Sequence, residues 1–143
     1  MVMAEQPQPP NSTSIRQHCF SEEAEGLEEG CTVHFQVVSF HRSLFIWVGV
    51  GTPKLASLAL AAAHPASACR ALPPAATLLR GGADDSSAGL AQKLAQKTGQ
   101  PVACSINLPP HTPLLQAFIE RRLLQELAAL ALIRGTANMN LAS

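Results

Sequence analysis

The sequence predicts an α+β fold in which an antiparallel sheet of about five to six strands packs against two α-helices. Residues 31–41, CTVHFQVVSFH, alternate apolar and polar residues with the period of two that is typical of a half-buried strand. Residues 44–50, LFIWVGV, are apolar on both sides of an extended chain. Two later segments repeat apolar residues at helical spacing, and together these observations predict a sheet with helices.

Length and composition restrict the class of protein. The 143 residues are 47% hydrophobic and 14% charged, which is enough apolar material for one compact core. The first 30 residues carry a net charge of −5 and the rest +5, without a run of Lys or Arg or an aromatic ladder, so nucleic acid is not an expected partner. The apolar stretches are shorter than the roughly 18 residues of a membrane span. With no secretory signal at the N-terminus, we expect a protein of the cytoplasm, with the nucleus as an alternative, and four free cysteines.

The chain divides by composition into four parts. We expect a disordered tail over 1–13, which is rich in Pro and Gln, and a short strand and acidic loop over 14–30. A single α+β domain follows over 31–134, and a C-terminal tail over 135–143.

The strands over 31–41 and 44–50 are separated by a short polar connection, which predicts an antiparallel hairpin. In the second strand, Phe45 and Trp47 lie on the side opposite to Leu44 and Ile46, so both faces need apolar cover. Helices of the same domain supply one layer, and a partner protein is a natural source of the other. Phe45 and Trp47 are therefore the candidate partner-binding residues, the alternative being that both are core residues under one of the helices.

The middle of the chain contains one clear helix. KLASLALAAA at 54–63 fits a helix by spacing and a strand by alternation, and TLLRGG at 77–82 predicts a short strand. The segment SAGLAQKLAQKT predicts a helix over about 86–98, capped by Asp85 or Ser86 and ended by Gly99.

The last two elements are a strand and a second helix. QPVACSINL at 100–108 reads as a strand, and Thr112-Pro113 marks the start of a helix over about 113–132. The strand places Val102, Cys104 and Ile106 on one side. The helix is expected to bury Leu115, Phe118 or Ile119, Leu123, Leu127 and Leu130, and to expose Glu120, Arg121, Gln125 and Glu126.

The glycines of SLFIWVGVGTPK, residues 43–54, raise the question of a phosphate-binding loop. A dinucleotide fingerprint requires a third glycine where Lys54 stands, and Pro53 has no N–H to offer a phosphate. Gly49 and Gly51 are better explained as a turn at the end of a strand.

Signals for metal or catalysis are weak. Two pairs of residues could be considered as zinc ligands, His18 with Cys19 and Cys31 with His34. Neither pair shows the repeated spacing that is typical of a zinc site, so no metal and no cofactor are expected. The enzymatic alternative is that Cys104 is a nucleophile paired with a histidine. The simpler interpretation is that Cys104 is a cysteine buried in a strand. We expect no catalytic residues and a protein that works by contact.

Three segments carry a resemblance. VHFQVVSFHRSLFIWVG, the block from LLRGGADDSSAGLAQKLAQKTGQPV into ACSINL, and LLQAFIERRLLQEL resemble the proteasome assembly chaperone 4 family, in the same order and with similar spacing. The most specific pieces are SLFIWVG at 43–49 and GLAQKLAQKTG at 89–99, and the resemblance covers about residues 31–127. The acidic N-terminal arm, the connection over 62–77 and the apolar end after Leu127 depart from the family pattern.

The resemblance implies a non-catalytic assembly chaperone. Such a protein would form a heterodimer with a subunit similar to proteasome assembly chaperone 3. It would also bind α-subunits of the 20S proteasome transiently while the α-ring forms. The resemblance further implies that 54–63 contains a strand. A different protein-protein adaptor, or a small enzyme that uses a cysteine or a histidine, remains the alternative.

Overall fold

A computed structural model of the chain describes residues 15–24, 31–63, 72–80, 86–109 and 113–133. These residues form one six-stranded sheet and two helices, which confirms the predicted α+β class. The strands are β1 (Arg16–Glu23), β2 (Thr32–Ser39), β3 (Leu44–Val50), β4 (Leu58–Ala61), β5 (Ala75–Leu79) and β6 (Val102–Asn107), and the helices are α1 (Ser86–Thr98) and α2 (Pro113–Ala129). The tails expected over 1–13 and 135–143 lie outside the described residues.

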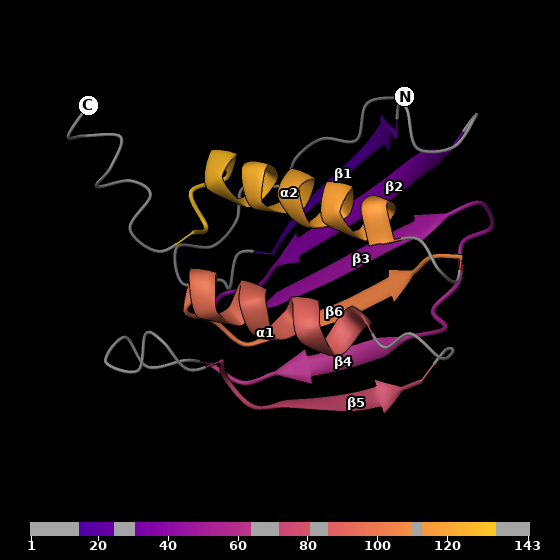
Figure 1. Ribbon diagram of the computed structural model, residues 1–143. Helices are drawn as coiled ribbons and strands as arrows, with labels where there is room; N and C mark the ends of the chain where they lie inside the picture. The colour runs from indigo at the N-terminus through magenta and orange to yellow at the C-terminus, as the bar shows by residue number, and fades with distance from the viewer. Residues whose placement is uncertain (1–14, 25–30, 64–71, 81–85, 110–112, 134–143) are drawn as a thin grey trace, which may run out of the picture.

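The strands follow the order β1-β2-β3-β6-β4-β5 across the sheet (Figure 1). Four of the five neighbouring pairs are antiparallel, including the predicted β2–β3 hairpin. The expectation of an antiparallel sheet is wrong for the pair β3–β6, which is parallel. The reason is that α1 carries the chain back across the sheet after β5, as parallel connections require, so β6 enters between β3 and β4 in the direction of β3.

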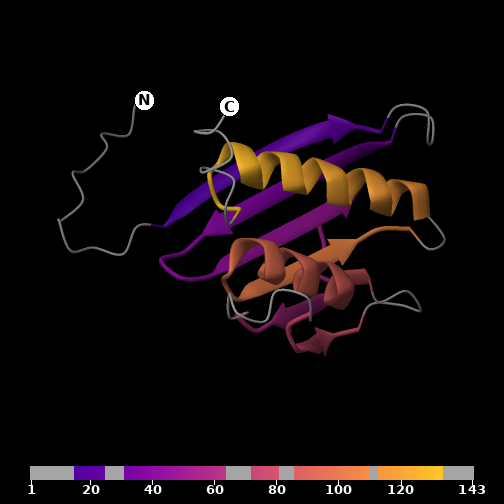
Figure 2. The same ribbon diagram turned by 60° about the vertical axis from the view of Figure 1, so that its left-hand side comes forward.

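Both helices lie on the same face of the sheet, with α1 over the β6-β4-β5 side and α2 over the β1-β2-β3 side (Figures 1 and 2). The strand residues that point toward the helices are buried, as their alternation predicts. They are Val33, Phe35 and Val37 on β2, Leu44, Ile46 and Val48 on β3, and Val102, Cys104 and Ile106 on β6. The helices contribute Leu90, Leu94, Leu115, Ile119, Leu123 and Leu127 to the same core.

The segment at 54–63 contains β4, in agreement with the resemblance, and α1 has the predicted bounds. Gly99 takes a φ of 72° and donates its N–H to the carbonyl of Ala95, as expected for the residue that ends a helix. Among the helices described, neither is long and apolar enough to cross a membrane.

Helix α2 ends at Ala129, earlier than the predicted residue 132. Ala131 turns the chain with a φ of 59°, and the N–H of Leu132 donates to the carbonyl of Leu127 at 2.9 Å. This hydrogen bond defines a Schellman motif, which usually has glycine where Ala131 stands. Leu130 therefore lies beyond the helix and is 37% exposed, so its predicted burial is wrong.

A charged network attaches α2 to β1. Arg122 donates to Glu22 at 3.0 Å and to Glu126 at 2.8 Å, and His18 Nε2 lies 2.6 Å from Glu126 Oε1. The expectation that Glu126 faces water is wrong, because its side chain is only 15% exposed. The hydrogen bond from Arg122, with a smaller contribution from His18, lowers the pKa of Glu126 below its ordinary value.

Candidate partner-binding face

The sheet face opposite α1 and α2 carries no helix of the described chain (Figures 1 and 2). We call it the open face. The five strands from β2 to β6 contain no Asp, Glu, Lys or Arg. Since charged side chains are the most costly to remove from water, this face can be buried against a partner with little desolvation penalty.

Phe45 and Trp47 lie on the open face, and both are half-buried. Their neighbours Leu44, Ile46 and Val48 point to the other side of β3 and are buried beneath the helices. Phe45 and Trp47 therefore do not lie under a helix, and the alternative that placed them in the core there is wrong. Both side chains are partly exposed on the open face.

Phe45 belongs to a line of apolar side chains that crosses five strands. Strand register pairs Val38 with Phe45, Phe45 with Ala103, Ala103 with Leu60, and Leu60 with Ala76. We call these five residues the apolar row. Leu60 is 43% exposed, so the row is a surface feature rather than part of the core.

Trp47, in the middle of β3, is held in place by two interactions. Its indole lies against Gly49, where a Cβ would come within 2.5 Å of two ring atoms, and its Nε1–H donates to the carbonyl of Lys54 at 2.8 Å. The expectation that both glycines form a turn is confirmed for Gly51, which has a φ of 76°, and is wrong for Gly49, which lies within β3. Gly49 is needed for the close approach of the indole.

The open face becomes polar toward β1. A hydrogen bond of 2.8 Å joins Ser21 Oγ to His34 Nδ1, and Cys19 pairs in register with Gln36. These four residues and Trp47 border a shallow hollow. The open face thus has an apolar half and, toward β1, a hydrogen-bonding half that ends at the exposed Glu23.

The sequence profile of the family described as Proteasome assembly chaperone 4 matches residues 32–108, which run from β2 to the end of β6. The chain belongs to the proteasome assembly chaperone 4 family. The two segments that carry the resemblance most specifically, SLFIWVG and GLAQKLAQKTG, fall on β3 and α1.

Curated members of the proteasome assembly chaperone 4 family agree with this assignment. The human protein is 39% identical over 97 residues, 68% of this chain and 76% of its own length. The mouse protein is 38% identical over 95 residues, 66% of this chain and 74% of its own length. Membership identifies an assembly chaperone and implies a role without catalysis.

A solved structure shares the fold of this family member. A chain of the structure titled "Crystal Structure of a Novel Chaperone Complex for Yeast 20S Proteasome Assembly" has a TM-score of 0.54 and 14% identity. The similarity covers 82% of this chain and 94% of the yeast chain. At this identity the likeness shows the fold alone.

Asn107 is a structural residue that sequence reasoning missed. Its Oδ1 accepts from the N–H groups of Ala56 and Ser57, and its Nδ2 donates to the carbonyl of Val48 and to Ser105 Oγ. The side chain thereby ties the segment before β4 to β3 and β6, next to Trp47. The available signal was the alternation of polar Ser105 and Asn107 with apolar residues in an otherwise apolar strand.

The residues considered for chemistry do not assemble a reactive site in the described part of the chain. Cys104 is fully buried, and burial raises the pKa of its thiol, which keeps it protonated and unreactive. Cys19 and Cys31 are free thiols as expected, and Cys69 lies outside the described residues. No group of three or more His, Cys, Asp and Glu residues is close enough to hold a metal ion in the described ranges.

Proposed function

We propose that this chain is a non-catalytic chaperone that pairs with a related small chaperone through its open face. The pair binds α-subunits of the 20S proteasome transiently while the α-ring forms. The partner is a subunit similar to proteasome assembly chaperone 3, and the pair acts in the cytoplasm and the nucleus. No cofactor takes part.

The apolar row is the observation that carries this proposal. Two sheets pack face to face when apolar side chains of each interdigitate, and such a layer is about 10 Å thick. Phe45 and Trp47 are half-buried within the fold, so a partner would cover the part of each aromatic side chain that is still exposed, toward the about 800 Å² that each partner contributes to a standard interface. A related chaperone with a similar sheet is the partner best matched to this surface. The yeast chain with the same fold comes from a chaperone complex, which supports a chaperone partner.

The proposal is tested by coexpressing the chain with a subunit similar to proteasome assembly chaperone 3. We expect a one-to-one complex in size-exclusion chromatography with light scattering. The immobilised complex should capture 20S α-subunits from cells of the source organism, as identified by mass spectrometry. Capture of other proteins, with neither a second small chaperone nor α-subunits, would favour a different adaptor function.

A further inference from the structure

The buried polar side chains of the described chain gather next to Trp47. Five polar residues are buried in the described ranges, and four of them form one hydrogen-bonded cluster, which consists of Ser57, Ser87, Ser105 and Asn107. Strand register places Ser105 beside Trp47 and Asn107 beside Gly49. Burying polar groups costs free energy unless each finds a partner, so a satisfied cluster within an apolar interior indicates a role in fixing local geometry.

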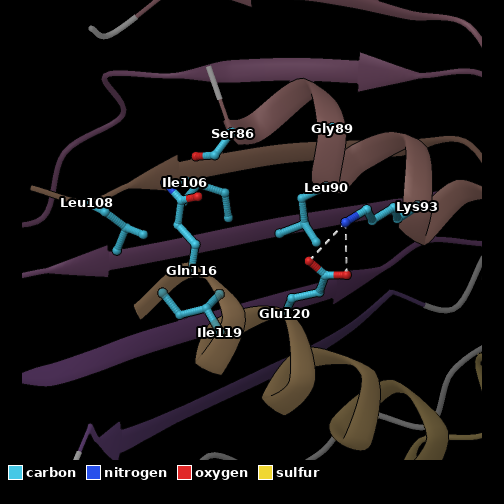
Figure 3. A pocket seen from close by; sticks show the side chains of 9 residues that line it. All are labelled: Ser86, Gly89, Leu90, Lys93, Ile106, Leu108, Gln116, Ile119 and Glu120. Atoms are coloured by element: carbon cyan, nitrogen blue, oxygen red, sulfur yellow. Dashed lines mark hydrogen bonds and ion pairs between the residues drawn. The ribbon is translucent and has the colours of Figure 1, made fainter. Parts of the chain in front are cut away.

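The cluster begins where the pairing of β4 with β6 ends. The two strands pair only as far as Cys104, and beyond it side chains hold the segments together. The N–H of Ile106 donates to Ser87 Oγ at 3.0 Å, in the first turn of α1, where Figure 3 shows Ser86 beside Ile106. Ser87 Oγ lies 2.7 Å from Ser57 Oγ and shares a hydrogen bond with it. The start of α1 therefore fixes the segment that enters β4.

Asn107 connects the two backbone segments that hold the indole. Its Oδ1 accepts from the N–H of Ala56 at 2.8 Å and from that of Ser57 at 3.2 Å. Its Nδ2 donates to the carbonyl of Val48 in β3 at 3.2 Å. The segment held in this way leads back to Lys54, whose carbonyl accepts from the indole N–H. Because this part of the chain lies outside the strands, side-chain hydrogen bonds rather than strand pairing fix the position of the Lys54 carbonyl.

We propose that Ser57, Ser87 and Asn107 are positioning residues for partner binding, which place the Lys54 carbonyl so that Trp47 is held in one orientation before the partner arrives. The role in binding rests on the proposed function, whereas the ordering of the indole is a property of this chain alone. All three side chains are buried and do not reach the partner themselves. They contribute to affinity because an indole that is already ordered loses less rotational freedom when a partner covers it.

The test removes single buried hydroxyl groups inside and outside the cluster. Ser87→Ala and Ser57→Ala each remove one from the cluster, and Ser57→Ala is the milder change because the Ile106 N–H keeps its bond to Ser87. Thr98→Val is the matched control, since it removes a buried hydroxyl that donates to the Leu94 carbonyl at 2.7 Å, at the other end of α1.

The first measurement is time-resolved fluorescence anisotropy of the chain without its partner. The sequence contains one tryptophan, so the signal reports the motion of the Trp47 indole alone. We expect the amplitude of fast indole motion to rise about twofold or more in both serine variants and to stay at the wild-type value in Thr98→Val. Unchanged anisotropy in both serine variants would overturn the positioning role.

The second measurement is the affinity for the partner chaperone, by isothermal titration calorimetry. Ser87→Ala should lose about threefold to tenfold in affinity, and Thr98→Val should bind as the wild type does. In a Trp47→Phe background, which lacks the indole N–H, Ser87→Ala should cause little further loss. Equal losses in both backgrounds, or in Ser87→Ala and Thr98→Val, would mean general destabilisation and overturn the role in binding. Absence of pairing by the wild type would overturn the proposed function, and the anisotropy would still decide whether the cluster orders Trp47.

Discussion

The indole of Trp47 covers Gly49, two residues further along the same strand, so closely that no other residue fits at position 49 without moving the ring. The contact with Gly49 and the hydrogen bond to the Lys54 carbonyl hold the indole in one orientation on the open face. A partner that binds there meets an already ordered tryptophan, which reduces the entropy lost on binding.

Gly49→Ala should displace the indole and break its hydrogen bond to Lys54. We expect a loss of about 1 to 2 kcal/mol in the free energy of unfolding. Chemical denaturation measures the loss, and tryptophan emission should shift to longer wavelength. In a Trp47→Ala background the same substitution should cost much less, since the clash is gone. Equal costs in both backgrounds would contradict the proposed contact.

Trp47→Ala and Leu60→Lys should each weaken pairing with the partner chaperone without unfolding the chain. Trp47→Ala removes a large half-buried anchor, and Leu60→Lys places a charge in the apolar row. We expect losses in pairing affinity of about tenfold or more, measured by isothermal titration calorimetry. Leu114→Lys, at a leucine that is 69% exposed on α2, is the matched control and should pair normally. Global unfolding of Trp47→Ala would argue against its role at an interface.

Asn107→Asp should destabilise the fold by about 3 kcal/mol. The substitution replaces the amide group that donates to Val48 and Ser105 with a second acceptor, and it buries a charge without a counterion. The loss should become smaller at acidic pH, where the new carboxyl group is protonated and can donate. A urea titration at pH 7 and pH 5 measures both effects, and a loss that does not depend on pH would contradict this account.

Ala131→Gly should stabilise the protein by about 0.5 to 1 kcal/mol. The φ of 59° is strained for alanine and is accessible to glycine without cost. Ala117→Gly, in the helical part of α2, should have the opposite effect and destabilise by about 1 kcal/mol. Thermal unfolding distinguishes the two, and a lower melting temperature for Ala131→Gly would contradict the expected relief of strain.

Glu126→Gln should destabilise the protein by about 1 kcal/mol at pH 7, because it weakens the hydrogen bonds to Arg122 and His18. The pKa of Glu126 is lower in the folded than in the unfolded protein, so the unfolded state binds more protons in the acidic range. The carboxylate therefore contributes its full stability above the ordinary glutamate pKa and loses it as pH falls through the folded pKa. The difference between wild type and variant in urea denaturation should shrink below about pH 4. A constant difference from pH 7 to pH 3 would contradict this assignment.

Local patterns predicted the elements well. The alternation in β2 and the apolar stripe of α1 depend on neighbouring residues alone, and both elements lie where they were expected. The parallel pairing of β3 with β6 depends on which strand fills a gap in the sheet, and no local pattern records this. The exposure of Glu126 was predicted wrongly for the same reason, because its partner His18 lies 108 residues away in the sequence.

The open face was predicted in part. Two apolar sides of one strand predicted that Phe45 and Trp47 lie away from the helices, and the structure places both on the face that carries no helix of the described chain. The apolar row could not be predicted, because it requires the register of four strand pairs at once.

The position of β6 also affects how this chain is made. β6 is the last strand in sequence, yet it lies between the β1-β2-β3 meander and the β4-β5 hairpin. During synthesis on the ribosome, these two pieces emerge with unpaired inner edges, and β3 is apolar on both faces. Such edges promote aggregation until the missing strand arrives. The nascent chain is therefore expected to need protection of its own before it can assist the assembly of another complex.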